Sequence, residues 1–272
     1  MGYPYGQGDA TQEVERVTAL GDRLFRCRPC RRTFNERMGT PFNHLRVPTD
    51  STLLVVLWRL RYKLSLRELS EMVLTRGFSF THETVREGEE RFAPLAAQRL
   101  RTKRWGKAGL RWHADETSTK VEGRWCYLYR AIDTAGHLVA TLVSATRDRD
   151  AAKRFFTQAL DVVGHTPEKV TTDGHDTYPR AIRATLGLAV RHRTSHYLNN
   201  RMEQDQRSVT PRYDPRRGVG SFAAAARVCS AHDEPRDFFR YRTGMNETVS
   251  LADQRRLFHE RWGAVCASLR AA

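Results

Sequence analysis

Residues 110–117, which read LRWHADET, constrain the fold more than any other stretch of the chain. Apolar side chains alternate with basic ones until the run reaches two acids, and this period of two predicts a strand with one buried face. We expect the strand to end at Asp115. Because successive side chains of a strand point to opposite faces, we expect Asp115 alone, and not Glu116, to serve a given site. An aspartate in a turn at the end of a strand is the competing interpretation.

Two further acids occupy comparable places along the chain. Residues 168–175 read EKVTTDGH, a second β-rich run that ends at Asp173, and residues 198–203 read LNNRME, which predicts a capped helix start carrying Glu203. Carboxylate oxygens are the ligands that Mg²⁺ prefers in proteins. Two such ions, held roughly 4 Å apart, support phosphoryl transfer. Each acid alone would most often be a surface or capping residue, but the three together form a candidate metal site.

Three strings, in this order, resemble a known family: DETSTKVEGRWCYLYRAID at 115–133, VTTDGH at 170–175 and YLNNRMEQDQR at 197–207. They are similar to DDE-type insertion-sequence transposases, in particular the compact branch that forms cointegrates. On that resemblance Asp115, Asp173 and Glu203 are the catalytic residues and the ligands of two Mg²⁺ or Mn²⁺ ions. The implied fold is an α/β, ribonuclease-H-like mixed sheet with flanking helices, which is the retroviral-integrase-like catalytic core.

The resemblance also implies an activity and partners. The expected function is metal-dependent 3′-end cleavage and strand transfer at the terminal inverted repeats of an insertion sequence. The expected partners are double-stranded DNA, both the repeats and the target, and further copies of the chain in at least a dimer. A prokaryotic cytoplasm, in association with the nucleoid, is the expected location.

Departures from the family pattern leave an alternative open. Gly88 stands where the family has a bulky aromatic residue, Gln206 where it has histidine and Thr210 where it has lysine. Arg207 shares a helix face with Glu203 and is expected to contact DNA. A decayed transposase that acts only as a DNA-binding protein or repressor would carry such departures. A nuclease of the same fold without sequence preference is a third interpretation.

Composition agrees with a nucleic-acid partner. The chain has 46 Lys and Arg against 31 Asp and Glu, a net charge of +15, which favours binding to a polyanion. No apolar run approaches the ~20 residues of a membrane span, and residues 1–10 lack the features of a secretory signal. We therefore expect no membrane partner. Five cysteines, an odd number, do not suggest a disulfide framework, so we expect a reduced compartment.

Residues 49–95 read as an all-α helix-turn-helix DNA-binding domain. Ser65 and Glu68 form a capping-box pattern, and Thr81 is placed to cap the next helix. If that helix is the recognition helix, Thr81, His82 and Arg86 lie near DNA. A plain helical bundle is the competing interpretation.

The segment before these helices is basic and carries Cys27 and Cys30. A CxxC pair is half of a structural zinc site, which usually has four ligands. His44 is a candidate third ligand and no fourth is evident, so two free thiols are favoured over bound zinc. We expect residues 1–22 to be an irregular leader.

The expected domain order is a basic arm with CxxC at 1–48, the helix-turn-helix domain at 49–95, a basic linker at 96–109, the catalytic core at 110–213 and a C-terminal helical region at 214–272. Within the core we expect three strands in a meander, a helix capped by Asp150, and a short last strand at residues 188–191.

Overall fold

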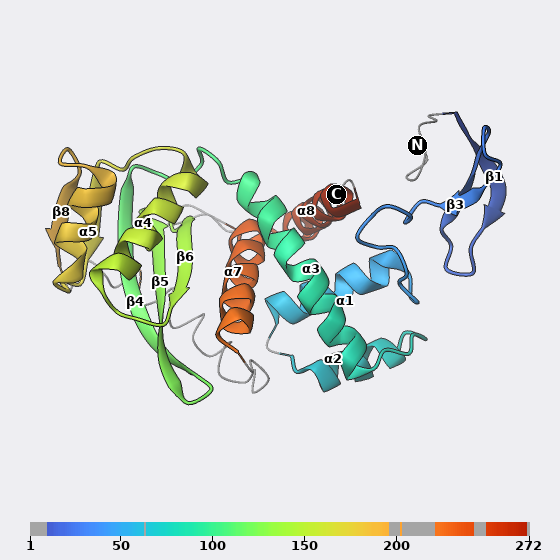
Figure 1. Cartoon of the computed structure of the whole chain (residues 1–272), viewed down its shortest axis with the longest axis horizontal. Coiled ribbons are helices and arrows are strands. Elements are labelled where there is room, and N and C mark those ends of the chain that lie inside the picture. The colour runs from blue at the N-terminus through green and yellow to red at the C-terminus, as the bar shows by residue number, and fades with distance from the viewer. Residues whose placement is uncertain (1–9, 63, 196–201, 203–220, 242–248, 271–272) are drawn as a thin grey trace.

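The computed structural model describes residues 10–62, 64–195, 202, 221–241 and 249–270. Its largest element is a five-stranded mixed sheet of order β6-β5-β4-β7-β8 (Figure 1). The strands are β4 (Arg111–Val121), β5 (Arg124–Asp133), β6 (Leu138–Ser144), β7 (Lys169–Thr172) and β8 (Arg191–Thr194). The first three form an antiparallel meander, and β7 and β8 run parallel to β4 and β7 respectively. The predicted mixed α/β sheet is confirmed.

Helices cover both faces of this sheet. On one face α4 (Arg149–Val163) and α5 (Thr177–Leu186) bury a core in which Trp112, Tyr129 and Phe155 are fully enclosed. On the other face lies α7 (Phe222–Phe239), whose first turns pack on apolar side chains of β5 and β6. Strand β5 is buried at nearly every position from Cys126 onward, because its successive side chains meet α4 on one face and α7 on the other.

Two local predictions in the sheet domain were wrong by a few residues. The N-cap of α4 is Asp148, whose carboxylate accepts from Ala151 N–H at 2.7 Å, and not Asp150. The last strand is β8 (Arg191–Thr194) rather than 188–191, and Leu188 is exposed. A strand at the edge of a sheet needs few buried side chains, so β8 could form from a polar stretch that carries almost no apolar signal.

A helical unit lies beside the sheet. It contains α1 (Thr49–Arg61), α2 (Leu66–Leu74), α3 (His82–Thr102) and, from the other end of the chain, α8 (Leu251–Arg270) (Figure 1). The capping box of Ser65 and Glu68 is present, and Thr81 caps α3 through Thr84 N–H, as predicted. A buried ion pair of Arg59 and Glu89, at 2.6 Å, joins α1 to α3.

The expected linker at 96–109 is in part helix, because α3 continues to Thr102. Two of its arginines are held in ion pairs. Arg104 is buried and pairs with Glu234 of α7 at 2.7 Å, and Arg101 contacts the same carboxylate at 3.2 Å. Helix α7 therefore connects the helical unit to the sheet. None of the helices in the described part of the chain is long and apolar enough to cross a membrane.

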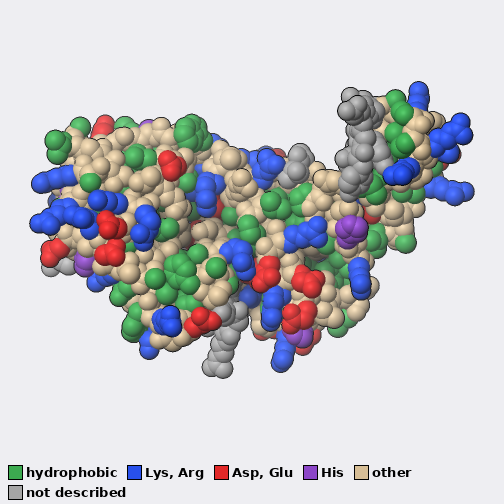
Figure 2. Space-filling model, viewed as in Figure 1, with side chains coloured by type: hydrophobic (Ala, Val, Ile, Leu, Met, Phe, Trp, Pro, Cys, Tyr) green, Lys and Arg blue, Asp and Glu red, His purple; other side chains and the backbone are tan. Residues whose placement is uncertain are grey.

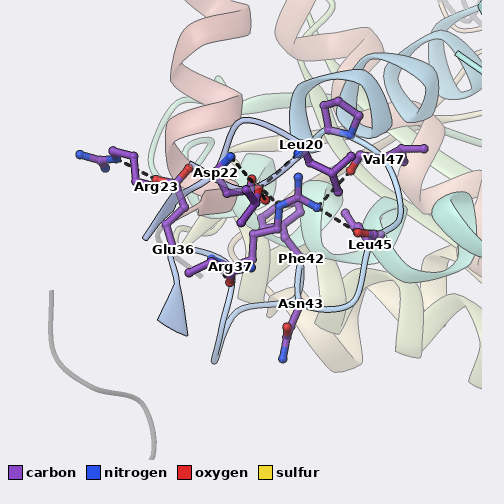
Figure 3. A network of polar contacts seen from close by, with 12 residues as sticks. Leu20, Asp22, Arg23, Glu36, Arg37, Phe42, Asn43, Leu45 and Val47 are labelled. Atoms are coloured by element: carbon purple, nitrogen blue, oxygen red, sulfur yellow. Dashed lines mark hydrogen bonds and ion pairs between the residues drawn. The ribbon is translucent and has the colours of Figure 1, made fainter. Parts of the chain in front are cut away.

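The prediction of an irregular leader was wrong for its second half. Strand β1 (Thr11–Val17) pairs with β2 (Arg23–Cys27), which pairs with β3 (Thr33–Asn35), in an antiparallel sheet of order β1-β2-β3. Arg37 ties this N-terminal sheet to the start of α1 (Figure 3). Its guanidinium donates to Asp22 at 2.6 Å and to the carbonyls of Leu45 and Val47 at 3.2 and 3.0 Å.

Candidate active site

Three carboxylates converge at one end of the β4–β7 ladder. Oxygens of Asp115, Glu116 and Asp173 all lie within 4.8 Å of one another, and each residue is half-buried. Across the residues that the structure describes, no other set of three histidine, cysteine or acidic side chains is grouped in this way. An all-oxygen donor set of this kind suits a hard divalent cation.

Strand register explains why Asp115 and Asp173 meet. In the parallel β4–β7 ladder Arg111 pairs with Lys169 and His113 with Thr171, an offset of 58 residues. The same offset of 58 separates Asp115 from Asp173. Neighbouring strands lie about 4.8 Å apart, so equal register carries the two carboxylates to neighbouring positions.

Glu116 is a correction to the sequence analysis. Strand β4 does not end at Asp115 but continues to Val121, and Glu116 joins the cluster although its side chain alternates with that of Asp115. Paired positions of β7 stop opposite His113, so among the described residues no strand lies beside β4 on that edge where the two acids stand. Both carboxylates can therefore approach Asp173 around the open edge.

Two side chains hold the Glu116 carboxylate. Oε1 accepts from Arg147 Nε at 2.6 Å, and Oε2 accepts from the hydroxyl of Tyr178 on α5. The Glu116 side chain is only 2% exposed, whereas Arg147 is 38% exposed and reaches it from the solvent side. Neither Arg147 nor Tyr178 was identified from the sequence, because they lie on separate segments that only the fold brings to the acid.

The charges of the cluster shift the pKa values of its neighbours. Burial, and then the charges of Glu116, Asp115 and Asp173, raise the pKa of Tyr178 well above its usual range, so the phenol stays protonated and donates. Burial acts to lower the pKa of Arg147, but the hydrogen bond and charge of Glu116 and the charge of Asp173 outweigh it and raise that pKa. Counted at their formal charges, one guanidinium and three carboxylates sum to −2, which a divalent cation would balance.

The loop after β7 positions Asp173. Its Oδ1 accepts from His175 N–H at 3.2 Å. Gly174, between them, has φ +104° and lies against β8: a Cβ added there would stand 2.5 Å from Thr194 Cγ2. Only glycine fits this turn, so the acid is followed by the one residue that lets the chain bend away at once.

The third predicted acid, Glu203, lies outside the described residues, as do Gln206, Arg207 and Thr210. Its chain neighbour Met202 is described and is fully buried. Competing acids nearby have structural roles. Asp133 is buried and accepts from the backbone N–H groups of Gly109, Ala135 and His137, which fixes the β5–β6 turn.

Comparison with known proteins decides the family. The family model described as a DDE domain, of the IS240 transposase type, matches residues 109–241. A Staphylococcus aureus transposase for the insertion sequence-like element IS431mec is 35% identical over 175 residues, which cover 63% of this chain and 77% of that protein. The chain belongs to the DDE transposases of insertion sequences.

Two further similarities were found. The transposase for insertion sequence element IS257 in transposon Tn4003 of Staphylococcus aureus is also 35% identical over 175 residues, which again cover 63% of this chain and 77% of that protein. Among solved structures, the catalytic core domain of HTLV-2 integrase in complex with magnesium matches 47% of this chain and 85% of its own, with a TM-score of 0.35 and 17% identity. The family assignment rests on the sequence matches.

The expected DNA-binding residues Thr81, His82 and Arg86 are all exposed at the start of α3. Acids share that surface. Glu83 lies 3.1 Å from His82 and 3.4 Å from Arg86, so part of the positive charge is already balanced. Arginine is more concentrated on the N-terminal sheet, where Arg23, Arg26, Arg28, Arg31 and Arg32 are exposed.

The CxxC pair lies at the end of β2. Cys27 is buried and Cys30 exposed, and Cys27 N–H donates to the Arg32 carbonyl at 3.0 Å across a tight turn. Backbone hydrogen bonding at Arg32 is the main cause that lowers the pKa of the Cys30 thiol. Among the described residues neither cysteine belongs to a group of three metal-ligating side chains, and His44 does not complete one.

Proposed function

We propose that the chain catalyses 3′-end cleavage and strand transfer at the terminal inverted repeats of an insertion sequence. The meeting of Asp115 and Asp173 in a DDE transposase chain carries this proposal. Glu203 is the proposed third acid. The core at 110–213 is proposed to be ribonuclease-H-like.

The proposed ligands of two Mg²⁺ or Mn²⁺ ions are Asp115, Asp173 and Glu203. Such a pair of ions, when bound, activates an attacking oxygen and stabilises the leaving oxygen of an in-line displacement. Glu116 is engaged on both oxygens by Arg147 and Tyr178. We assign Glu116 a positioning role: it holds Arg147 beside the proposed metal ligands. There the Arg147 guanidinium is available to bind a phosphate of the DNA.

DNA recognition is proposed for the two N-terminal units. The helix-turn-helix at 49–95 presents Thr81, His82 and Arg86, and the basic arm at 1–48 presents the exposed arginines of its sheet, visible as the blue cluster at one end of the molecule (Figure 2). Phosphate contacts supply affinity and register, whereas base contacts supply sequence specificity. The basic linker at 96–109, whose first part is the end of α3, and a C-terminal region at 214–272 complete the proposed order, and the active assembly is at least a dimer.

Cleavage of a defined DNA tests the proposal. The substrate is a duplex that carries the inverted repeat flanking the reading frame, incubated with Mg²⁺ or Mn²⁺. The parent should nick at the repeat end, while Asp115→Asn and Asp173→Asn should bind the same duplex without nicking it. Binding without cleavage by the parent would favour the decayed transposase. Equal cutting of a scrambled duplex would favour the nuclease without sequence preference.

A further inference from the structure

The hairpin of β4 and β5 extends beyond the rest of the sheet (Figure 1). Its turn, Glu122-Gly123, has positive φ at both residues, +52° and +78°, as in the tight turn that best matches the twist of two strands. The last pair of β5 with β6 is Tyr127 with Ser144, and β4 pairs with β7 only as far as His113. In the described residues, the outer half of this hairpin therefore has no strand on either side.

One face of the hairpin is backed by α7. Val121, Cys126 and Leu128 form a buried cluster with Ala225 and Cys229 of that helix. This packing fixes the hairpin relative to the sheet. Its opposite face is consequently held in a defined orientation, although that face is not covered by the described residues.

The opposite face forms a cleft of about 330 Å³ lined by Glu116, Ser118, Trp125, Tyr127 and Arg147. Trp125 is 57% exposed, and Lys120 Nζ lies 4.8 Å from the centre of its ring. Glu116 lines the cleft and also belongs to the carboxylate cluster. The cleft therefore begins at the candidate metal site and ends at an exposed indole.

We propose that this cleft holds one unpaired nucleotide of the DNA beside the phosphodiester that is being processed, with its base stacked on Trp125. The inference rests on the proposed function, since it concerns the same DNA. Trp125 stands at the open end of a polar cleft rather than in an apolar patch, and its flat ring is a surface on which a base can stack.

Charge and shape both favour a nucleotide as the occupant. Two cations, Lys120 beside the Trp125 ring and Arg147 in the cleft lining, lie at this face, and they suit a phosphate backbone. Base–aromatic stacking needs the flat face of a base, which a duplex exposes only at an end or after a base leaves the stack. The cleft volume is close to the lower end of the ~300–1,000 Å³ range of small-molecule sites, which fits a single nucleotide.

The test compares a blunt duplex with the same duplex bearing a short single-stranded 3′ extension, whose first unpaired base is 2-aminopurine. Binding is measured in EDTA, so that no strand is cut. The parent should quench the 2-aminopurine fluorescence and prefer the extended duplex. Trp125→Ala should lose the quenching and bind the extended duplex roughly 5- to 150-fold more weakly, as expected for one stacked base, with unchanged affinity for the blunt duplex. Trp125→Phe should retain most of both effects.

Trp105→Ala is the matched control, because Trp105 is also a largely exposed tryptophan, at 62%, but lies outside the cleft. It should behave as the parent. If Trp125→Ala does not fold, Ser118→Phe, which fills the cleft from its floor, should cause the same selective loss. Equal affinities of parent and Trp125→Ala for both DNAs, or an equal loss on both, would overturn the inference. Failure of the parent to cleave with Mg²⁺ would instead count against the proposed function, and the binding comparison would still be decisive.

Discussion

Gly88 lies in the middle of α3 and faces α1. A Cβ added there would stand 3.5 Å from Val56 Cγ2 and 3.9 Å from Thr52 Cγ2, which is ordinary van der Waals contact. Glycine inside a helix costs about 1 kcal/mol relative to alanine. We therefore expect Gly88→Ala to raise the free energy of unfolding by about that amount in urea titrations. A lower free energy of unfolding would mean that Val56 cannot accept the extra methyl group.

Gly88 was interpreted from the sequence as a weakness of the recognition helix. Helix α3 runs without interruption from His82 to Thr102, and Gly88 is buried in it against α1. The space toward Val56 and Thr52 would admit one methyl group, and the helix is intact with glycine there. A departure from the family pattern is therefore not by itself a sign of a decayed copy, because the facing side chains can change with it.

Gly174 has the opposite environment. Its φ of +104° is unfavourable for any L side chain, and Thr194 Cγ2 leaves no room for a Cβ. We expect Gly174→Ala to lower the free energy of unfolding by roughly 1–3 kcal/mol and to weaken Mn²⁺ binding, because Asp173 precedes it. Urea titration and isothermal titration with Mn²⁺ measure the two effects.

Gly187→Ala is the control for that substitution. Gly187 also has positive φ, +95°, but its Cβ would meet nothing within 4 Å. Gly187→Ala should lower the free energy of unfolding through backbone strain, without any change in Mn²⁺ affinity. If both variants lost Mn²⁺ affinity alike, the effect at Gly174 would be a general loss of stability and not a shift of Asp173.

The candidate site was predictable where it depends on local pattern. Asp115 and Asp173 each follow a β-rich run, and equal register then brings them together. Glu116 was excluded because its side chain alternates with that of Asp115 along the strand, so that only one of the two was expected to serve the site. The open edge of β4, and the contacts from Arg147 and Tyr178, are properties of the assembled sheet that no window of sequence contains.

At the scale of elements, helix starts were predicted more accurately than helix lengths. Caps such as Ser65 and Thr81 act within four residues, so the sequence shows them directly. The sequence predicted a helical region at 214–272, without the full length of α7 (Phe222–Phe239) inside it. The second half of α7 carries buried His232, Asp233 and Glu234, which conceal the apolar period that a helix facing a core would normally show.

Those buried acids are paired across the sheet. Asp233 accepts from Arg130 Nε at 2.9 Å and from the Thr141 hydroxyl at 2.6 Å, while Glu234 pairs with Arg104 at 2.7 Å. Burial acts to raise the pKa of Asp233, but the Arg130 charge and the hydrogen bonds hold it well below its usual range. Removing one partner of such a pair would leave an uncompensated buried charge.

Asp237, one turn further along α7, differs from Asp233. Its carboxylate accepts from Leu138 N–H at 2.9 Å, but burial raises its pKa from 3.8 to about 6. The folded protein therefore binds this proton more tightly than the unfolded chain does. The resulting stability is fully present below about pH 4 and is lost as the pH rises through 6.

Asp237→Asn removes that titration and keeps an oxygen for Leu138 N–H. We expect the variant to gain stability over the parent as the pH rises from 4 to 8, by up to about 3 kcal/mol for a shift of roughly two pKa units. Urea titrations of both proteins across this pH range measure the difference in their free energies of unfolding. The other acids contribute equally to both proteins, so their contributions cancel in this difference. A difference that does not change with pH would contradict the raised pKa of Asp237.

At the scale of the whole molecule, residues 49–95 contribute to two buried clusters, of which the one around Leu69 and Phe80 lies within them and the other is shared with the C-terminal helices. The buried cluster around Leu57 and Phe92 includes residues from near the other end of the chain, namely Ala231, Phe239, Val265, Cys266 and Leu269. The domain prediction placed residues 49–95 in a separate unit that binds DNA alone. The shared cluster makes that unit depend on α7 and α8 for the burial that stabilises it.

We accordingly expect a fragment of residues 49–95 to lack a cooperative thermal transition, whereas the full chain has one. Circular dichroism at 222 nm follows helix content in both. A cooperative transition in the fragment would show that α1, α2 and the first half of α3 suffice. DNA-binding measurements are therefore better made on the full chain.

Salt dependence of DNA binding by the full chain separates the two proposed recognition surfaces. Each neutralised phosphate adds about −0.9 to the slope of log affinity against log salt concentration. Arg28 and Arg32 are exposed on the N-terminal sheet, whereas Arg86 on α3 lies 3.4 Å from Glu83, which balances part of its charge.

We expect Arg28→Gln with Arg32→Gln to reduce the magnitude of the slope by about 1.8, because two phosphate contacts are lost. Arg86→Gln should reduce it by less than 0.9, because Glu83 already offsets part of its charge. A slope that is unchanged in the double variant and reduced by a full unit in Arg86→Gln would show that α3, and not the N-terminal sheet, carries the phosphate contacts.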